Sequence, residues 1–179
     1  MADDRPDILV IADATDPRRG RLRMGGLDVA CALGRGGVVA EKREGDGATP
    51  AGAWPMRYGL YRPDRMPAPQ SALAFRPIAE GDGWCDAPQD RNYNRPVPLP
   101  YPASAETLWR DDHLYDLLVV LGHNDDPVIP GAGSAIFFHL ARPDYGPTDG
   151  CVAVARDGML AVLARCGPDT VMRIALPRD

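Results

Sequence analysis

Residues 137–153 read Phe-Phe-His-Leu-Ala-Arg-Pro-Asp-Tyr-Gly-Pro-Thr-Asp-Gly-Cys-Val-Ala, and this stretch carries the most informative pattern in the chain. An apolar run over residues 134–138 predicts a buried strand that ends on His139. A Pro/Gly-rich loop follows, and Cys151 then stands directly after Gly150 at the start of a second apolar run. A thiol on a glycine turn, with an imidazole at the end of a neighbouring strand, is the minimum set of groups that a cysteine acyl-transfer enzyme needs.

These groups have a chemical and a structural interpretation. A cysteine attacks as its thiolate, which a nearby base such as His139 helps to form. Gly150 permits a sharp turn, so the backbone N–H groups of Gly150 and Cys151 can converge on a developing oxyanion. In the structural interpretation, Cys151 packs as a buried hydrophobe and His139 is a core residue with satisfied hydrogen bonds. This stretch alone leaves both interpretations open.

A second segment, residues 42–56, reads Lys-Arg-Glu-Gly-Asp-Gly-Ala-Thr-Pro-Ala-Gly-Ala-Trp-Pro-Met. Together with the Thr-Asp-Gly-Cys turn at residues 148–151, it resembles the L,D-transpeptidase catalytic domain, also called the YkuD family. Members of that family carry a Gly…Thr-Pro-x-Gly stretch early in the domain and a His…Ser/Thr-His-Gly-Cys signature late in it. The resemblance covers residues 7–176, as a single domain. The matching residues are Gly47, Thr49, Pro50 and Gly52 for the first element, and His139, Thr148, Gly150 and Cys151 for the second.

The sequence departs from the family pattern at three points. Asp149 stands where the family has a histidine before the Gly-Cys pair, and Ala153 stands where the family has a polar residue. The loop between the two motif ends, residues 140–147, is shorter than the usual stretch. These differences predict a divergent branch that keeps the chemistry and changes the substrate contacts.

The composition is that of one globular domain rich in turns. Of the 179 residues, 45% are apolar and 25% are charged, with 19 Gly and 19 Pro. This turn content favours many short strands. The resemblance implies a mainly β, L,D-transpeptidase-like β-sandwich or barrel with mixed sheets and one or two short helices. The formal net charge of −5, without an isolated Lys/Arg block, argues against nucleic acid and membrane surfaces as partners.

Apolar runs and turn residues predict where the elements lie. Residues 62–103 are rich in Pro, Asp, Asn and Tyr, so we expect an irregular binding wall or lid there. Ser104 predicts a short helical turn over residues 106–109, and Asp157 predicts the start of a helix that runs to residue 166. The predicted strands cover residues 8–12, 27–32, 36–40, 54–60, 115–121, 135–140 and 170–175, with a turn at residues 16–20.

The cysteines and the N-terminus bear on metal binding and on the compartment. No cysteine pair has CxxC spacing and no histidine pair has HExxH spacing, so we predict no metal and no cofactor. Widely separated thiols suit a reducing cytosol. The N-terminal residues are polar, and the apolar run at residues 8–12 is too short for a signal-peptide core. No run reaches transmembrane length, so we predict a cytoplasmic protein. The cysteines are Cys31, Cys85, Cys151 and Cys166.

The resemblance implies a cysteine enzyme of peptidoglycan metabolism. Cys151 would attack the L,D bond between the third-position diamino acid and D-Ala of a stem tetrapeptide and form a thioester. His139 would accept the thiol proton and pass it to the leaving amine. In the family, a backbone carbonyl just after this histidine orients the ring, which here is that of Leu140. The expected partners are peptidoglycan stem peptides, with carbapenem-type β-lactams as covalent inhibitors.

The acceptor of the acyl group divides the possible functions. Without an export signal, the chain is expected to meet recycled muropeptides rather than polymerised wall, which favours an L,D-carboxypeptidase of murein recycling. The alternative is an L,D-transpeptidase that forms 3–3 crosslinks. Because Asp149 replaces a histidine of the signature, a non-catalytic domain that binds wall peptides stays a further alternative.

Six residues are predicted to contact the substrate. Arg95 and Arg142 carry guanidinium groups that suit the free carboxylates of a stem peptide. The others are Thr148 and Asp149 on the cysteine turn, and Tyr93 and Trp84 on the irregular wall. In the alternative interpretation, the two arginines are ordinary surface residues and the two aromatic rings pack in the core.

Overall fold

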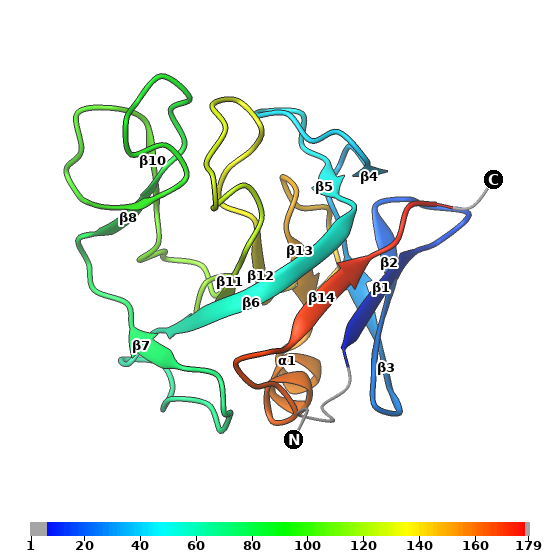
Figure 1. The fold of residues 1–179 in the computed structure, drawn as a ribbon. Coiled ribbons are helices and arrows are strands. Elements are labelled where there is room, and N and C mark those ends of the chain that lie inside the picture. Colours follow the sequence, from blue (N-terminus) through cyan, green and yellow to red (C-terminus); the bar gives the residue numbers. More distant parts are fainter. Residues whose placement is uncertain (1–6, 178–179) are drawn as a thin grey trace.

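The computed structural model describes residues 7–177, and Figure 1 shows their arrangement. Residues 1–6, on which part of the cytoplasmic prediction depends, lie outside the described residues. In the described part of the chain there is one α-helix, α1 (Arg156–Leu163), and the mainly β class is confirmed. The strands are β1 (Ile8–Ala12), β2 (Arg19–Met24), β3 (Leu27–Ala32), β4 (Val38–Val39), β5 (Thr49–Pro50), β6 (Gly52–Tyr61), β7 (Phe75–Pro77), β8 (Asp82–Cys85), β9 (Pro96–Pro98), β10 (Ala105–Thr107), β11 (Leu117–Leu121), β12 (Phe137–Leu140), β13 (Val152–Val154) and β14 (Val171–Ile174).

The main sheet closes on itself as a barrel. Its strands within residues 7–177 follow the order β11-β12-β13-β3-β2-β1-β14-β6-β7, and β11 also pairs with β6. The long strand β6 allows this closure because its first half pairs with β14 and its second half pairs with β11. The pairs β1–β14, β6–β7 and β12–β13 are parallel, whereas β11–β12 and β2–β3 are antiparallel, so the prediction of a mixed sheet is confirmed.

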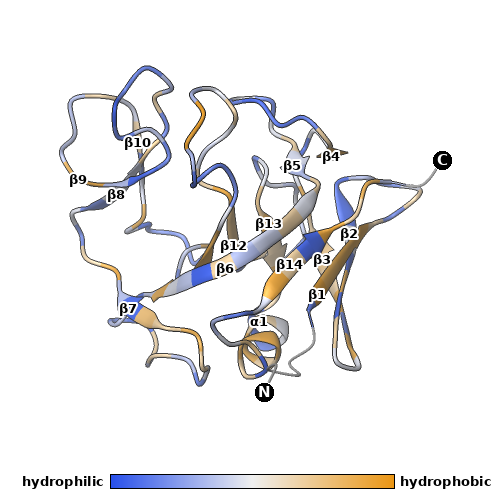
Figure 2. Cartoon of the chain, viewed as in Figure 1, coloured by the Kyte–Doolittle hydropathy of each residue, from blue (hydrophilic) through white to orange (hydrophobic). Residues whose placement is uncertain are grey.

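Two apolar clusters lie on opposite faces of β11. All five residues of this strand are buried, as expected for an apolar run that has no solvent face. Leu117, Val119 and Leu121 belong to the barrel core, whereas Leu118 and Val120 belong to a second cluster. This second cluster joins the barrel to an outer layer, which is the small sheet β10-β8-β9 and the loops around it. Figure 2 shows hydrophobic residues along β12 and hydrophilic ones in the loops near β10.

The same alternation decides where the motif residues point. Successive side chains of a strand face opposite sides of the sheet. In β12, Phe138 and Leu140 face the barrel core and Phe137 joins the second cluster, so His139 faces the outer layer. β13 runs parallel to β12 with His139 opposite Ala153, and Val152 and Val154 face the core. The strand period therefore places Cys151 on the same outer side as His139.

The helix packs on the barrel core at the end opposite to β4 and β5 (Figure 1). Met159, Val162 and Leu163 are its buried residues. The prediction that the helix starts with Asp157 as its cap is wrong, because Ala155 is the capping residue and Asp157 lies in the first turn, where a negative charge is favourable to the helix dipole. In the described part of the chain, no helix combines the length and the hydropathy needed to cross a membrane.

Several strand predictions are confirmed, and others are corrected. The apolar runs at residues 8–12 and 27–32 form β1 and β3 as expected, and those near residues 54–60, 115–121 and 170–175 form β6, β11 and β14 with shifted ends. The run at residues 36–40 is reduced to the two-residue strand β4.

One segment was assigned wrongly, and two others contain strands that were not predicted. The turn predicted at residues 16–20 extends into β2, whose buried residues Gly20, Leu22 and Met24 alternate with exposed arginines. The helical turn predicted at residues 106–109 is replaced by β10, because pairing with β8 overrides the local capping signal of Ser104. The irregular stretch at residues 62–103 also contains β7, β8 and β9.

Candidate active site

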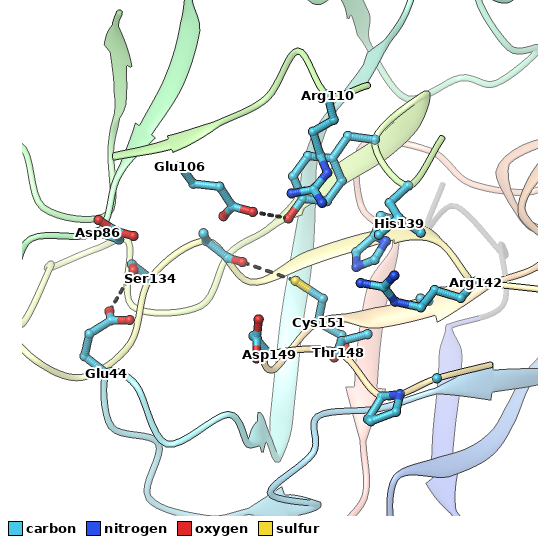
Figure 3. A pocket seen from close by; sticks show the side chains of 16 residues that line it. Glu44, Asp86, Glu106, Arg110, Ser134, His139, Arg142, Thr148, Asp149 and Cys151 are labelled. Carbon is cyan, nitrogen blue, oxygen red and sulfur yellow. Dashed lines mark hydrogen bonds between the residues drawn. The ribbon is translucent and has the colours of Figure 1, made fainter. Parts of the chain in front are cut away.

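A cavity of about 330 Å³ lies between the outer face of the barrel and the outer layer, and Figure 3 shows its side chains. Cys151 and His139 both line it, as do charged residues from the loops on either side. The lining residues are Glu44, Asp86, Glu106, Arg110, Leu114, Tyr115, Ser134, Ala135, His139, Arg142, Gly146, Pro147, Thr148, Asp149, Cys151 and Ala153.

The Cys151 thiol is held by two backbone groups. Its Sγ donates to the carbonyl oxygen of Ala135 at 3.3 Å, and the N–H of Phe137 donates to Sγ at 3.3 Å. The residue is 7% exposed, and burial, followed by the negative charge of Glu106, raises the pKa of the thiol to about 12. The resting site therefore holds a neutral thiol.

The His139 ring is oriented by a main-chain carbonyl. Its Nδ1 lies 2.9 Å from the carbonyl oxygen of Leu140, the contact that the family resemblance led us to expect. Because a carbonyl oxygen only accepts, Nδ1 carries the proton and Nε2 is the acceptor in the neutral ring. Burial lowers the pKa of His139 to about 4, against the opposing effect of the Leu140 carbonyl. A neutral imidazole able to accept a proton is thus present at neutral pH.

Thr148 and Gly150 shape the turn that presents Cys151. The Thr148 hydroxyl donates to the Cys151 carbonyl oxygen at 2.7 Å and accepts from the Gly150 N–H at 3.1 Å. Gly150 has φ +132°, and a Cβ there would lie 2.7 Å from the Ala48 carbonyl oxygen, so only glycine fits. The Gly150 N–H that we expected in an oxyanion hole is therefore already engaged with Thr148. The N–H of Cys151 is left as the expected donor.

The first motif lies directly behind this turn. Thr49 is fully buried, and its hydroxyl accepts from the Gly34 N–H at 2.8 Å. Gly34 in turn forms a β-bridge with Thr148. The Gly…Thr-Pro segment thus supports the cysteine turn by its backbone, and from the same loop Glu44 reaches the cavity and accepts from the Ser134 hydroxyl at 2.7 Å.

The structure brings three of the six predicted contact residues to the cavity. Arg142, Thr148 and Asp149 line it, and Asp149 forms an ion pair with Arg35. The Arg142 side chain is exposed, and Figure 3 shows its guanidinium directed toward His139 and Cys151. Their contact with substrate stays a prediction.

The other three predicted contact residues lie elsewhere. Arg95 and Trp84 line a different cavity of about 270 Å³, on the far side of Phe137. Tyr93 is only 2% exposed, and its hydroxyl donates to Glu44 and accepts from the Gly133 N–H. These three residues do not line the thiol cavity, because both aromatic rings are buried in the packing of the outer layer and Arg95 donates to the carbonyl oxygen of Asp125. Their contact with substrate stays a prediction.

Sequence reasoning missed the charged residues of the outer layer. Arg110 pairs with Asp112 and lies over the Tyr115 ring at 5.0 Å. Glu106 accepts from the Tyr115 hydroxyl at 2.5 Å, and burial raises the pKa of its carboxyl. These residues come from segments without a motif, and only the fold brings them to the cavity, so the sequence offered no signal for them.

A thiol on the turn that leads into β13 and an imidazole on the adjacent strand β12, facing one cavity, are the groups of a cysteine acyl-transfer site. The model of the L,D-transpeptidase catalytic domain, YkuD, matches residues 7–174, and the chain belongs to this family.

Two solved structures are similar to the chain at low identity. An L,D-transpeptidase from Mycobacterium smegmatis has 11% identity and a TM-score of 0.46, with 96% of this chain and 59% of that chain covered. L,D-transpeptidase 1 of Mycobacterium tuberculosis has 9% identity and a TM-score of 0.39, with 94% and 62% covered. This chain therefore spans about three-fifths of either structure. Among curated proteins, none matches.

Proposed function

We propose that this protein is a cysteine L,D-carboxypeptidase that trims the stem tetrapeptides of muropeptides to tripeptides. The observation that carries the proposal is the position of Cys151 and His139 on the same outer face of β12 and the β13 turn, lining one cavity. Membership of the L,D-transpeptidase family supports an enzyme that acts on the L,D bond before D-Ala.

The geometry supports a two-step mechanism. The Cys151 thiol adds to the carbonyl carbon of the diamino acid while Nε2 of His139 accepts the thiol proton. The resulting oxyanion faces the N–H of Cys151, and collapse breaks the C–N bond as His139 returns the proton to the leaving D-Ala amine. Water, deprotonated by His139, then hydrolyses the thioester and frees the tripeptide and the thiol.

Burial decides when the proton moves. The pKa of Cys151 is raised to about 12 and that of His139 is lowered to about 4, so a thiolate–imidazolium pair is unfavourable in the empty site. Proton transfer therefore accompanies attack on the bound carbonyl instead of preceding it. In an enzyme with a pre-formed ion pair the thiolate is already present, whereas here the neutral thiol of the empty site is expected to react only slowly with electrophiles.

The charges around the cavity suit a zwitterionic peptide. Arg142 and Arg110 line one side, close to His139, and Glu44, Asp86 and Glu106 line the other. A stem tetrapeptide carries a free C-terminal carboxylate, which a guanidinium binds well, and its diamino acid carries an amine that carboxylates can accept. We assign the terminal carboxylate to Arg142.

The acceptor and the compartment belong to the same proposal. The family name makes 3–3 crosslinking the second candidate, with the amine of another stem peptide in place of water. We further propose that the protein acts on muropeptides in the cytoplasm, since its four cysteines are thiols in the described structure, which suits a reducing compartment.

The test is incubation with a defined disaccharide tetrapeptide, followed by mass analysis. Release of D-Ala and tripeptide supports the carboxypeptidase, whereas a dimer that has lost one D-Ala supports crosslinking. Binding without either product favours the non-catalytic alternative. An otherwise identical peptide with an amidated C-terminus serves as the matched control, and its equal cleavage would rule out the proposed role of Arg142.

A further inference from the structure

The side chain of Asn94 is a hydrogen-bonding hub of the outer layer, with four hydrogen bonds. It lies between β8 and β9, is 5% exposed and has φ +55°. Its Oδ1 accepts from the N–H of Ala135 at 3.0 Å and from Nε1–H of Trp84 at 3.0 Å. Its Nδ2 donates to the carbonyl oxygens of His123 at 3.1 Å and Asn124 at 2.8 Å. The amide thus uses two donors and two acceptor positions, which is its full capacity.

Both partners of the catalytic sulfur are connected to this one oxygen. The first partner is the carbonyl of Ala135, the residue whose N–H binds Asn94 Oδ1 and whose own φ is +53°. The second is the N–H of Phe137, whose ring packs edge-on against the Trp84 ring at 5.2 Å. Oδ1 of Asn94 therefore fixes the segment on either side of Ile136 that holds the thiol.

We propose that Asn94 is a positioning residue for Cys151. It acts through Ala135 and Phe137 and lines the cavity on the far side of Phe137, not the one that contains the thiol. The role rests on the proposed function only in that Cys151 is the nucleophile. Because a misplacement of about 1 Å in a reacting atom can cost about 10²-fold in rate, loss of this hub is expected to lower turnover without weakening substrate binding.

Asn124 provides a matched control. It also has a positive φ, +51°. Its side-chain amide stabilises the loop over residues 124–133, with Nδ2 donating to the carbonyls of Ile129 and Gly133 and Oδ1 accepting from the Ile129 N–H. Among the hydrogen bonds of residues 7–177, none joins the Asn124 side chain to Ala135 or Trp84. Glycine accepts a positive φ without strain, so Asn94→Gly and Asn124→Gly each remove one side-chain hub and leave the backbone conformation permitted.

The experiment compares these two variants with the unchanged protein. We measure kcat and KM for the tetrapeptide, and separately the rate at which iodoacetamide alkylates Cys151, read by peptide mass. Asn94→Gly is expected to lower kcat roughly 30–100-fold with KM within about threefold, and to slow alkylation about tenfold. Asn124→Gly is expected to leave all three within about threefold.

A third variant keeps the test decisive if Asn94→Gly folds poorly. Trp84→Phe keeps a ring against Phe137 but removes the Nε1–H that donates to Asn94 Oδ1, so it is expected to lower kcat about three- to tenfold with KM unchanged. Equal losses in the two glycine variants, or an unchanged kcat in Trp84→Phe, would assign Asn94 a structural role only. If the tetrapeptide is not cleaved at all but alkylation still separates the glycine variants, the proposed function fails and the positioning role stands.

Discussion

Burial sets the protonation of the two central side chains, and at the scale of single residues this determines the chemistry. Cys151 and His139 are each held by main-chain groups and are nearly inaccessible to solvent. Low polarity favours the neutral form of both, so the thiol gives up its proton as its attack on an electrophilic carbon proceeds. Replacing Cys151 and replacing His139 are therefore expected to have different effects on the rate, and His139 is expected to set its pH dependence.

Replacing the nucleophile is expected to remove turnover and preserve the fold. Cys151→Ser keeps the size of the side chain and its two backbone contacts, but a serine hydroxyl is a far weaker nucleophile beside a neutral imidazole. We expect no measurable D-Ala release and a melting temperature within a few degrees of the unchanged protein. Cys85→Ala, in the outer layer but outside the thiol cavity, is the control, and loss of turnover there instead would move the nucleophile.

Replacing His139 is expected to lower the rate, and the pH profile of the unchanged protein is expected to report the pKa of this base. His139→Gln is expected to reduce kcat by about 10²–10⁴-fold, the usual contribution of general acid–base catalysis.

In the unchanged protein, the pKa lowered to about 4 means that His139 stays a neutral base down to that pH. A plot of kcat/KM against pH should therefore be flat between pH 5 and 8 and fall near pH 4. An acid limb near 6.5, the ordinary value for histidine, would contradict the assignment.

At the scale of elements, the strand period and one glycine turn place the site. The alternation along β12 puts His139 on the outer face, and the parallel pairing with β13 carries Cys151 to the same side. The turn between them depends on Gly150, whose backbone conformation and close approach to Ala48 both exclude a side chain. A substitution in this turn is therefore expected to lower activity while the rest of the fold is kept.

Adding one methyl group to the turn is expected to abolish activity. In Gly150→Ala the new Cβ would meet the Ala48 carbonyl oxygen, so the turn must shift and carry the thiol with it. Gly26→Ala is the matched control, because Gly26 also has a positive φ of +84° but meets nothing within 4 Å. We expect at least about 10²-fold loss of kcat in Gly150→Ala and none in Gly26→Ala, with circular dichroism and melting curves checking the fold. Similar losses in both would mean that backbone strain, not the position of the thiol, limits the rate.

The elements that could be predicted from sequence are those whose side chains carry their own signal. Apolar runs predicted β1 and β11, and the two motifs predicted the pairing of Cys151 with His139 at one cavity. β2 was missed because its outward residues are arginines, and β10 because its strand form depends on pairing with β8. The charged wall formed by Glu106 and Arg110 depends on the closed barrel, which no local pattern encodes.

Over the whole molecule, buried histidines make stability depend on pH. Burial lowers the pKa of His123 and of His139 to about 4. His123 is 7% exposed, its Nδ1 has no hydrogen-bond partner among residues 7–177, and its ring packs edge-on against Trp54 at 4.8 Å. A proton on either ring would therefore add a poorly solvated charge to the folded protein, whereas water solvates that charge in the unfolded chain.

The sign of the effect follows from proton binding. Between pH 6.5 and 4 the unfolded chain binds more protons than the folded protein, so the free energy of unfolding falls as the pH is lowered through this range. Between pH 7 and 5 each histidine is expected to cost roughly 1–2 kcal/mol, because one pKa unit corresponds to about 1.4 kcal/mol. Glu106 acts in the opposite sense, since burial raises the pKa of its carboxyl and favours the protonated form in the folded protein.

The change in the free energy of unfolding between pH 7 and pH 5, compared between two proteins, separates the contribution of His123 from that of Glu106. The free energy of unfolding in urea is measured at pH 7 and pH 5 for the unchanged protein and for His123→Asn, which removes a titrating ring that does not line the thiol cavity. The variant can be less stable at both pH values, but its loss between them should be smaller by roughly 1–2 kcal/mol. Because Glu106 is present in both proteins, its contribution cancels in the difference. Equal slopes in the two proteins would show that His123 does not carry a lowered pKa, and that its ring is solvated well enough to accept a proton in the folded state.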